Sequence, residues 1–169
     1  MRDLLKVMTK KTPLYLVYRY FLDRHRQQEM QKKFWEWSEE DRNRIDFYKQ
    51  FITTGDIVFD IGANMGNRAK VFYSLGAVVI AVEPQTQCAT FLQAVFTHKA
   101  NFHLVRKALG CSVGQAEMFI SNAHVISSLS TDWIRAVQET GRFKKYEWNR
   151  KEMVLVDTLD NLVLNQAHI

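Results

Sequence analysis

The sequence of 169 residues predicts an α/β fold, in which a parallel β-sheet follows a helical N-terminal segment. From residue 55 onward, short apolar runs typical of buried parallel strands alternate with stretches whose apolar residues recur at helical spacing. The first apolar run, residues 57–61, leads into a loop that carries Gly62 and Gly66. We therefore expect a helical extension over residues 1–54 and a sheet domain over residues 55–169.

Composition and charge limit the classes of protein to consider. Apolar residues make up 47% of the chain, enough for the core of a globular domain. The net charge of +5 comes mainly from the first 50 residues, where charges of both signs are mixed, so we expect no nucleic-acid partner. Cys88 and Cys111 lack metal-ligand spacing, which predicts free thiols, no metal site and a cytoplasmic location. No apolar stretch is long enough for a signal peptide or a transmembrane segment.

Two helices are expected before the sheet. Thr12–Pro13 has the residues preferred at the N-cap and at the first position of a helix. Ser38 with Asp41 has the spacing of a capping box, which predicts the start of the second helix. This second helix should end at Gly55, because glycine readily adopts the left-handed conformation that stops a helix.

The remaining elements follow from the alternation of apolar runs and turns. After Leu109 the sequence favours a turn, with residues 116–121 pairing back as a hairpin. A helix stopped by Gly141 and a final helix capped by Asp157 are also expected. The predicted strands are residues 57–61, 77–83, 102–109 and 153–157, and the predicted helices are residues 67–75, 86–98, 131–140 and 158–165.

The loop after the first strand has residue types that suit a close approach to a ligand. In open parallel sheets, ligands bind beyond the carboxyl ends of the strands. Gly62 and Gly66 remove side chains where the backbone must turn sharply, and Asn64 tolerates a left-handed conformation. Asp60, at the end of the strand, can accept hydrogen bonds from loop amides or from a cationic ligand group.

Glu83 is the second feature of this candidate site. It ends the second predicted strand, 21 residues after Gly62. An acid at that position can accept hydrogen bonds from both hydroxyls of a ribose. The glycine loop and the distant acid together predict a nucleoside-binding site.

The spacing of the glycines bears on which nucleoside is bound. Dinucleotide-binding folds carry G-x-G-x-x-G, in which a helix N-terminus meets a pyrophosphate. Here Asn64 occupies the place of the second glycine, and the spacing is G-x-x-x-G. A nicotinamide-dependent oxidoreductase fragment therefore remains an alternative that fits the pattern less well.

The segments VFDIGANMGN, VIAVEPQ, RKALG and VDTLDNL, in this order, resemble the FkbM-type family of class I S-adenosylmethionine-dependent methyltransferases. The resemblance covers roughly residues 55–163. It implies a Rossmann-like sheet, S-adenosylmethionine as cofactor, and methyl transfer to a hydroxyl of a small acceptor such as a sugar or a polyketide-like molecule. By this resemblance the cofactor site comprises the loop residues Asp60, Gly62, Asn64 and Gly66, the ribose ligand Glu83, and Pro84, Gln85, Lys107 and Ala108 near the adenine.

The resemblance also implies further strands after residue 163, which this sequence does not contain. We therefore expect a C-terminally incomplete sheet whose first strand is left uncovered along one edge. On that expectation the chain associates with itself or with a complementing C-terminal chain, and it transfers no methyl group alone. A truncated, non-catalytic binding module is a further alternative.

The residue that removes the acceptor proton is not identified by the sequence. His124 is a weak candidate for a general base, because histidine titrates in a suitable pH range. Ser127, Ser128 and Ser130 could contact a substrate hydroxyl, or they could cap the helix that follows.

Overall fold

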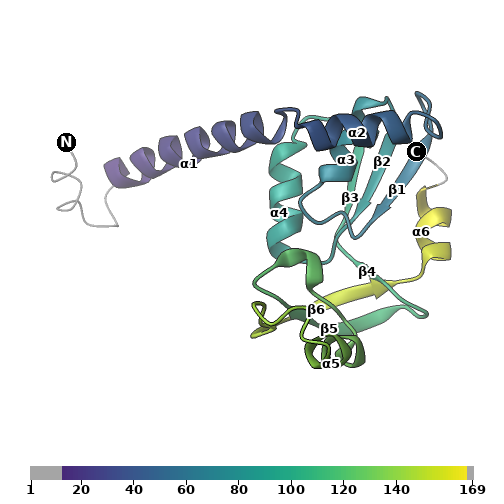
Figure 1. Cartoon of the computed structure of the whole chain (residues 1–169). Coiled ribbons are helices and arrows are strands. Elements are labelled where there is room, and N and C mark those ends of the chain that lie inside the picture. Colours follow the sequence, from purple (N-terminus) through teal and green to yellow (C-terminus); the bar gives the residue numbers. More distant parts are fainter. Residues whose placement is uncertain (1–12, 167–169) are drawn as a thin grey trace. The chain divides into compact units, whose positions relative to one another are not determined.

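The computed structural model describes residues 13–166 (Figure 1). The chain divides into two compact units, residues 1–37 and 38–169. The described part of the first unit contains helix α1, Pro13–Phe34, which begins at the expected proline; Thr12 lies outside the described residues. Helix α2, Glu39–Tyr48, belongs to the second unit with the sheet, whereas the sequence analysis places it in the N-terminal extension.

Helix α2 starts as expected but ends earlier. The backbone N–H of Asp41 donates to the hydroxyl of Ser38, and the N–H of Ser38 donates to the carboxylate of Asp41, which confirms the capping box. The helix stops at Tyr48, so the expected end at Gly55 is wrong. The chain continues in turns over residues 49–51. A separate turn follows, in which the carboxylate of Asp56 accepts hydrogen bonds from the N–H and the hydroxyl of Thr53.

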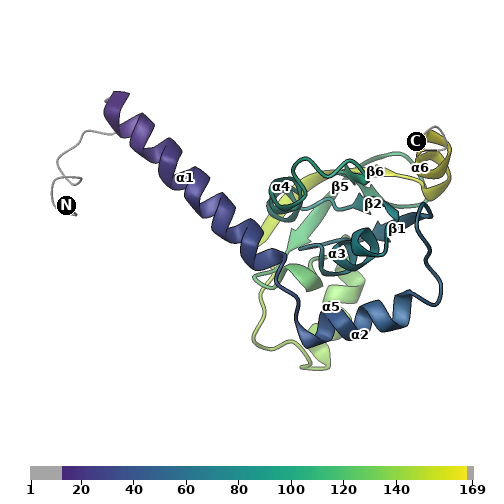
Figure 2. The same cartoon turned by 90° about the horizontal axis from the view of Figure 1, so that it is seen from above.

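A three-stranded parallel sheet forms the centre of the second unit (Figures 1 and 2). Its strands are β1, Ile57–Ile61, β2, Val78–Val82, and β3, Phe102–Val105, in the order β1-β2-β3. Helix α3, Asn67–Ser74, connects β1 to β2, and helix α4, Thr86–Val95, connects β2 to β3. The predicted α/β class with a parallel sheet is therefore confirmed, with helices close to their expected bounds.

Strand β1 lies at an edge of the first sheet. β2 is the central strand and its last four residues are buried, together with Val71 of α3 and Leu92 of α4. Among the described strands β1 pairs only with β2, and Ile57 and Ile61 are about half exposed. The expected uncovered edge beside the first strand is thus present in the structure.

A second sheet contains strands β4, Ala108–Leu109, β5, Gly114–Ile120, and β6, Arg150–Asp157, in the order β4-β6-β5. The expected single strand over residues 102–109 is therefore wrong, because β3 and β4 lie in different sheets. The expected hairpin is also wrong, because β6 lies between β4 and β5 and pairs with both. Burial explains this arrangement, since β6 contributes Val154 to a core with Met118 and Ile120 of β5.

The remaining helices come before and after β6 in the sequence. Helix α5, Thr131–Glu139, is capped by the hydroxyl of Ser130, which accepts from the N–H of Trp133. Helix α6, Leu159–Gln166, is capped by Thr158, whose hydroxyl accepts from the N–H of Asn161. The expected cap Asp157 instead precedes this cap and accepts from the N–H of Thr158. None of the helices in residues 13–166 combines the length and the apolar character needed to cross a bilayer.

Candidate functional site

The candidate site lies where the parallel strands of the first sheet end. Because β1, β2 and β3 run in the same direction, their carboxyl ends meet at one edge of the sheet. The loop after β1, Glu83 after β2, and Lys107 after β3 therefore come from neighbouring strand ends, near the second sheet (Figure 1). The sequence analysis selected residues from all three segments.

The loop after β1 has the backbone conformation that its residue types predict. Gly62, Asn64 and Gly66 all have positive φ angles, of 73°, 51° and 79°. No protein atom lies within 4 Å of the place where a Cβ on Gly62 would stand, so the space beside this glycine is open. The loop thus presents bare backbone to an open region, as a ligand-binding loop requires.

Glu83 fixes this loop to the second strand. Its side chain is 2% exposed, and its two carboxylate oxygens accept hydrogen bonds from the backbone N–H groups of Asn64 (2.7 Å) and Gln85 (2.8 Å). Burial raises the pKa of Glu83, and these two hydrogen bonds offset part of that effect. Each oxygen keeps further lone-pair capacity, so the carboxylate can hold the loop and still accept from a ligand hydroxyl.

Asp60, near the end of β1, is buried, and its carboxylate is only partly satisfied by polar partners. The side chain is 3% exposed, and Oδ1 lies 3.5 Å from Nε of Arg68. Oδ2 has no hydrogen-bond partner among the described residues. Burial raises the pKa of Asp60, with Arg68 and the N–H of Ala69 acting in the opposite direction. A buried carboxylate oxygen without a partner is costly, which marks this position as a candidate functional group.

A cavity of about 220 Å³, here called the Glu83 cavity, lies beside the loop. Its walls combine backbone from the loop, the carboxylate and apolar side chains of both sheets. Asp60 and Gly66, which the sequence analysis also selected, do not line it. The lining residues are Ile61, Gly62, Asn64, Val82, Glu83, Pro84, Gln85, Lys107, Ala108, Leu109, Met118, Val125 and Ser127.

Lys107 and Ala108 bring the start of the second sheet to the Glu83 cavity. Nζ of Lys107 lies 2.7 Å from Oδ2 of Asp157, at the end of β6. The hydrogen bond from Lys107 lowers the pKa of Asp157, and the N–H of Thr158 acts in the same direction. This ion pair joins the end of β6 to the segment between β3 and β4, so Lys107 has a structural partner within the protein.

Some residues that line the Glu83 cavity were missed by the sequence analysis, among them Met118 and Val125. Met118 comes from β5, and Val125 comes from the short 3₁₀ turn His124–Ile126. Neither has a motif around it, so no signal in the sequence could have selected them. Ser127, which was considered for substrate contact, lines the cavity and accepts from the N–H of Ser121.

The proton acceptor remains unidentified. The backbone of His124 is next to Val125 in the 3₁₀ turn, but the side chain of His124 lies outside the part of the chain that the structure describes. Ser130 caps α5, and the hydroxyl of Ser128 accepts from the N–H of Ser130, so these two serines have structural roles.

A second cavity of about 320 Å³, here called the Arg68 hollow, also adjoins the loop. It shares Gly62, Asn64 and Val125 with the Glu83 cavity, so the loop is a wall common to both. The remaining lining residues are Arg44 and Tyr48 of α2, Ala63 and Met65 of the loop, and Asn67 and Arg68 of α3.

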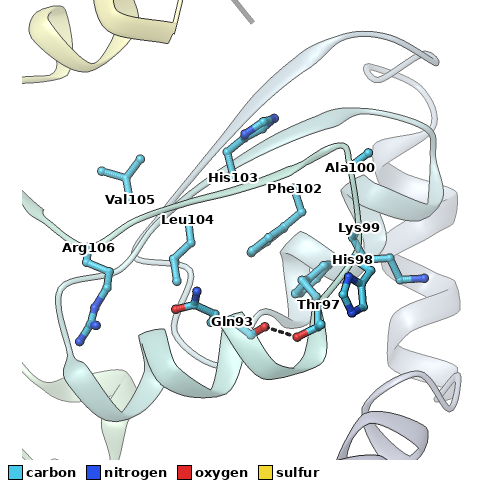
Figure 3. A pocket seen from close by; sticks show the side chains of 11 residues that line it. Gln93, Thr97, His98, Lys99, Ala100, Phe102, His103, Leu104, Val105 and Arg106 are labelled. Carbon is cyan, nitrogen blue, oxygen red and sulfur yellow. Dashed lines mark hydrogen bonds between the residues drawn. The ribbon is translucent and has the colours of Figure 1, made fainter.

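A larger open groove of about 1150 Å³ follows the outer edge of β3 and contains none of the predicted site residues (Figure 3). Phe102 and Leu104 of β3 point toward Gln93 of α4, whereas His103 and Val105 point the other way (Figure 3). Cationic Lys99 and Arg106 also line the groove. Charged residues along a free strand edge protect it from unwanted pairing, which gives this groove a structural explanation.

No cluster of His, Cys, Asp and Glu side chains suited to a metal ion occurs within residues 13–166. Comparison of the chain with family models, with curated proteins and with solved structures finds no match. The geometry of the two cavities is therefore the basis for a functional hypothesis.

Proposed function

We propose that the chain binds S-adenosylmethionine in the Glu83 cavity and is an FkbM-type, Rossmann-like methyltransferase that acts on a hydroxyl of a small acceptor. One observation carries the proposal. The glycine loop and the buried Glu83 line the same cavity, and a hydrogen bond from the N–H of Asn64 to Glu83 joins them. The proposal includes a cytoplasmic location, for which the two free cysteines are the supporting observation.

The residues around the Glu83 cavity fit the chemical groups of this cofactor. The carboxylate of Glu83 can accept hydrogen bonds from ribose hydroxyls, and the apolar side chains of Leu109 and Met118 suit one face of an adenine. Asp60 supplies a negative charge close to the loop, which suits a ligand with a cationic ammonium or sulfonium group.

The protein's part in methyl transfer is one of positioning. S-adenosylmethionine, when bound, supplies a methyl group already activated by its sulfonium. The glycine loop and Glu83 would hold the adenosine end, and the Arg68 hollow would place the acceptor across the loop. A base must also take the hydroxyl proton, and no described side chain is assigned to this role.

Isothermal titration calorimetry tests the proposed cofactor. S-adenosylhomocysteine is expected to bind the full chain in a saturable manner, whereas NAD is expected to show no binding. Binding of NAD in its place would support the oxidoreductase alternative. Binding of neither compound would favour a non-catalytic module.

Replacement of Glu83 by alanine tests the role of the carboxylate. Loss of hydrogen bonds to a charged group should weaken the binding of S-adenosylhomocysteine by about 1.5–3 kcal/mol. Glu117→Ala is the matched control, because Glu117 is a surface residue that pairs with Lys151 outside the cavity. An unchanged dissociation constant for a folded Glu83→Ala protein would remove Glu83 from the site.

Replacement of Gly62 by valine tests the loop. A β-branched residue is strained at a φ of 73°, and its side chain would occupy the open space beside the loop. We expect loss of S-adenosylhomocysteine binding with an unchanged circular dichroism spectrum. Gly114→Val is the control, because Gly114 starts a strand, has no positive φ and has open space around it. Normal binding by Gly62→Val would show that this loop does not hold the cofactor.

A further inference from the structure

The Arg68 hollow has a lining that favours negatively charged groups. Its polar lining side chains are Arg44, Tyr48, Asn64, Asn67 and Arg68. Among the described residues no acid lines it, although Glu40, Asp41 and Asp60 pair with the two arginines from outside the lining. The side chain of Arg68 is 53% exposed, and it forms an ion pair with Asp60 through Nε. The terminal nitrogens of Arg68 are therefore the donors best placed to take a ligand in this hollow.

Arg44, which lines the hollow from α2, is held in place by ion pairs. Its two terminal nitrogens donate to Glu40 and Asp41 of the same helix, and Asp41 also accepts from Nζ of Lys70 at 2.7 Å. Asp41 and Lys70 are both almost fully buried, so this network fastens α2 to α3. Arg44 and Arg68 thus line one cavity from two helices that a buried ion pair joins.

The N-terminus of α3 adds to the positive potential of the hollow. The N-cap of this helix is Gly66, which has no side chain to accept from the first amides. Asn67 and Arg68, the first two residues of the helix, line the hollow. The buried carboxylate of Asp60 already accepts from the N–H of Ala69. The first two amides of the helix, those of Asn67 and Arg68, are therefore the ones that favour a carboxylate or phosphate, together with the guanidinium of Arg68.

The amides of the glycine loop are less available to such an anion. The N–H groups of Ala63, Asn64 and Gly66 donate within the protein, to Val82, Glu83 and Ala63 respectively. The anion-binding groups therefore lie on the α2 and α3 side of the hollow, away from the Glu83 cavity. This placement favours a second ligand rather than an extension of a ligand in the Glu83 cavity.

We infer that the Arg68 hollow binds the acceptor, and that this acceptor carries a carboxylate, phosphate or sulfate group which contacts Arg68 and the start of α3. The inference rests on the proposed function for the identity of the acceptor, but the anion site can be tested without it. The hydroxyl to be methylated would then approach across Gly62 and Asn64, the wall that both cavities share.

The test uses inorganic phosphate as the probe and amide NMR spectra of the full chain at constant ionic strength. We expect saturable shifts at Asn67 and Arg68, both with and without saturating S-adenosylhomocysteine. Arg68→Gln should weaken phosphate binding at least tenfold, and Arg68→Lys should weaken it less because the charge remains. Arg135→Gln is the control, because Arg135 is an exposed arginine of α5 that pairs only weakly with Asp132.

Each other outcome has a distinct meaning. If S-adenosylhomocysteine displaces phosphate and 5′-methylthioadenosine does not, the anion site belongs to the amino-acid end of the cofactor and the acceptor inference is wrong. Absence of saturable shifts, or equal effects of Arg68→Gln and Arg135→Gln, would refute the anion site. Phosphate binding without any binding of S-adenosylhomocysteine would refute the proposed function and the acceptor role, while supporting an anion site.

Discussion

Asp60 is a single residue whose burial has a measurable effect on stability. Its Oδ2 has no partner among the described residues, and burial raises the pKa of its carboxyl group. Asp60→Asn removes a buried charge and can keep an acceptor for the N–H of Ala69. We expect this variant to raise the free energy of unfolding of the ligand-free protein at pH 7 by about 1 kcal/mol in urea denaturation.

The pH dependence of this effect has a definite sign. A raised carboxyl pKa means that the folded state binds more protons than the unfolded state, so stability falls as pH rises from the ordinary aspartate range through the raised value. The gain from Asp60→Asn should therefore be small in acid and should widen toward neutral pH. A difference in stability between Asp60→Asn and the wild type that is the same at all pH values would contradict a raised pKa of Asp60. A variant that is less stable than the wild type at pH 7 would contradict it as well.

The two cysteines should differ sharply in reactivity. Cys88 is buried, and burial together with the nearby charges of Glu83 and Glu152 raises the pKa of its thiol to about 12, whereas Cys111 is exposed. Because the thiolate is the reactive form, the folded protein at pH 8 should react rapidly with a thiol reagent at Cys111 alone. Cys111→Ser should abolish the rapid phase, and rapid labelling of Cys88 in that variant would show that its surroundings open readily.

Residues with a local signal were the ones that could be predicted. Gly62, Asn64 and Glu83 stand at strand ends, where backbone conformation and chain direction fix their position. Met118 and Val125 line the same cavity because residues 118–127 lie close to the carboxyl ends of the strands in the first sheet. The sequence analysis could not place them, because it predicted that residues 116–121 pair back as a hairpin, whereas this strand pairs with β6.

At the scale of elements, the turn that enters β2 has little tolerance for a side chain. Gly76 has a φ of 86°, and a Cβ there would lie 2.7 Å from the hydroxyl of Thr54. The carbonyl of Gly76 also accepts from the N–H of Gly55, which ties the entry of β1 to the entry of β2. We expect Gly76→Ala to lower the free energy of unfolding by roughly 2 kcal/mol, by backbone strain and crowding.

The matched control for Gly76→Ala is Gly114→Ala, at the start of β5. Gly114 has no positive φ and no neighbour within 4 Å of an added Cβ, so this change should alter stability by about 0.5 kcal/mol or less. Thermal or urea denaturation of both variants provides the comparison. Equal effects would mean that the contact with Thr54 relaxes at no cost.

The elements that were predicted well are those with local causes. The capping box of α2 and the alternation from β1 to α4 are readable from a few neighbouring residues. The end of α2 was placed too late because the chain leaves the helix after Tyr48, and Thr53, which donates to Asp56, already belongs to the turn before β1. The break between β3 and β4 was missed because it depends on a long-range contact. Lys107 pairs with Asp157, which is distant in the sequence.

At the scale of the whole sheet unit, the two edges of the first sheet differ in character. The β3 edge is lined by cationic residues, whereas the β1 edge exposes Ile57 and Ile61. An apolar, unprotected strand edge favours pairing with another strand. We expect the apparent mass of the protein in sedimentation velocity to rise with concentration, and Ile57→Lys to reduce that rise without loss of thermal stability.

Val113→Lys is the control for this prediction, because Val113 is 66% exposed in the turn before β5. It adds the same charge away from the β1 edge. If both variants reduce self-association equally, net charge is the cause and the β1 edge is not the contact. A wild-type protein that stays monomeric at all concentrations would contradict the prediction.

The order of strands in the second sheet has a consequence for how the protein is made. β6 lies between β4 and β5, although it follows β5 by about 30 residues in the chain. During synthesis, β4 and β5 leave the ribosome before the strand that pairs with both of them exists. The apolar side chains of Met118 and Ile120 therefore stay exposed to solvent, or bound to a chaperone, until β6 has been synthesised and can pack against them. The first sheet carries no such delay, since each of its strands pairs with the one made just before it.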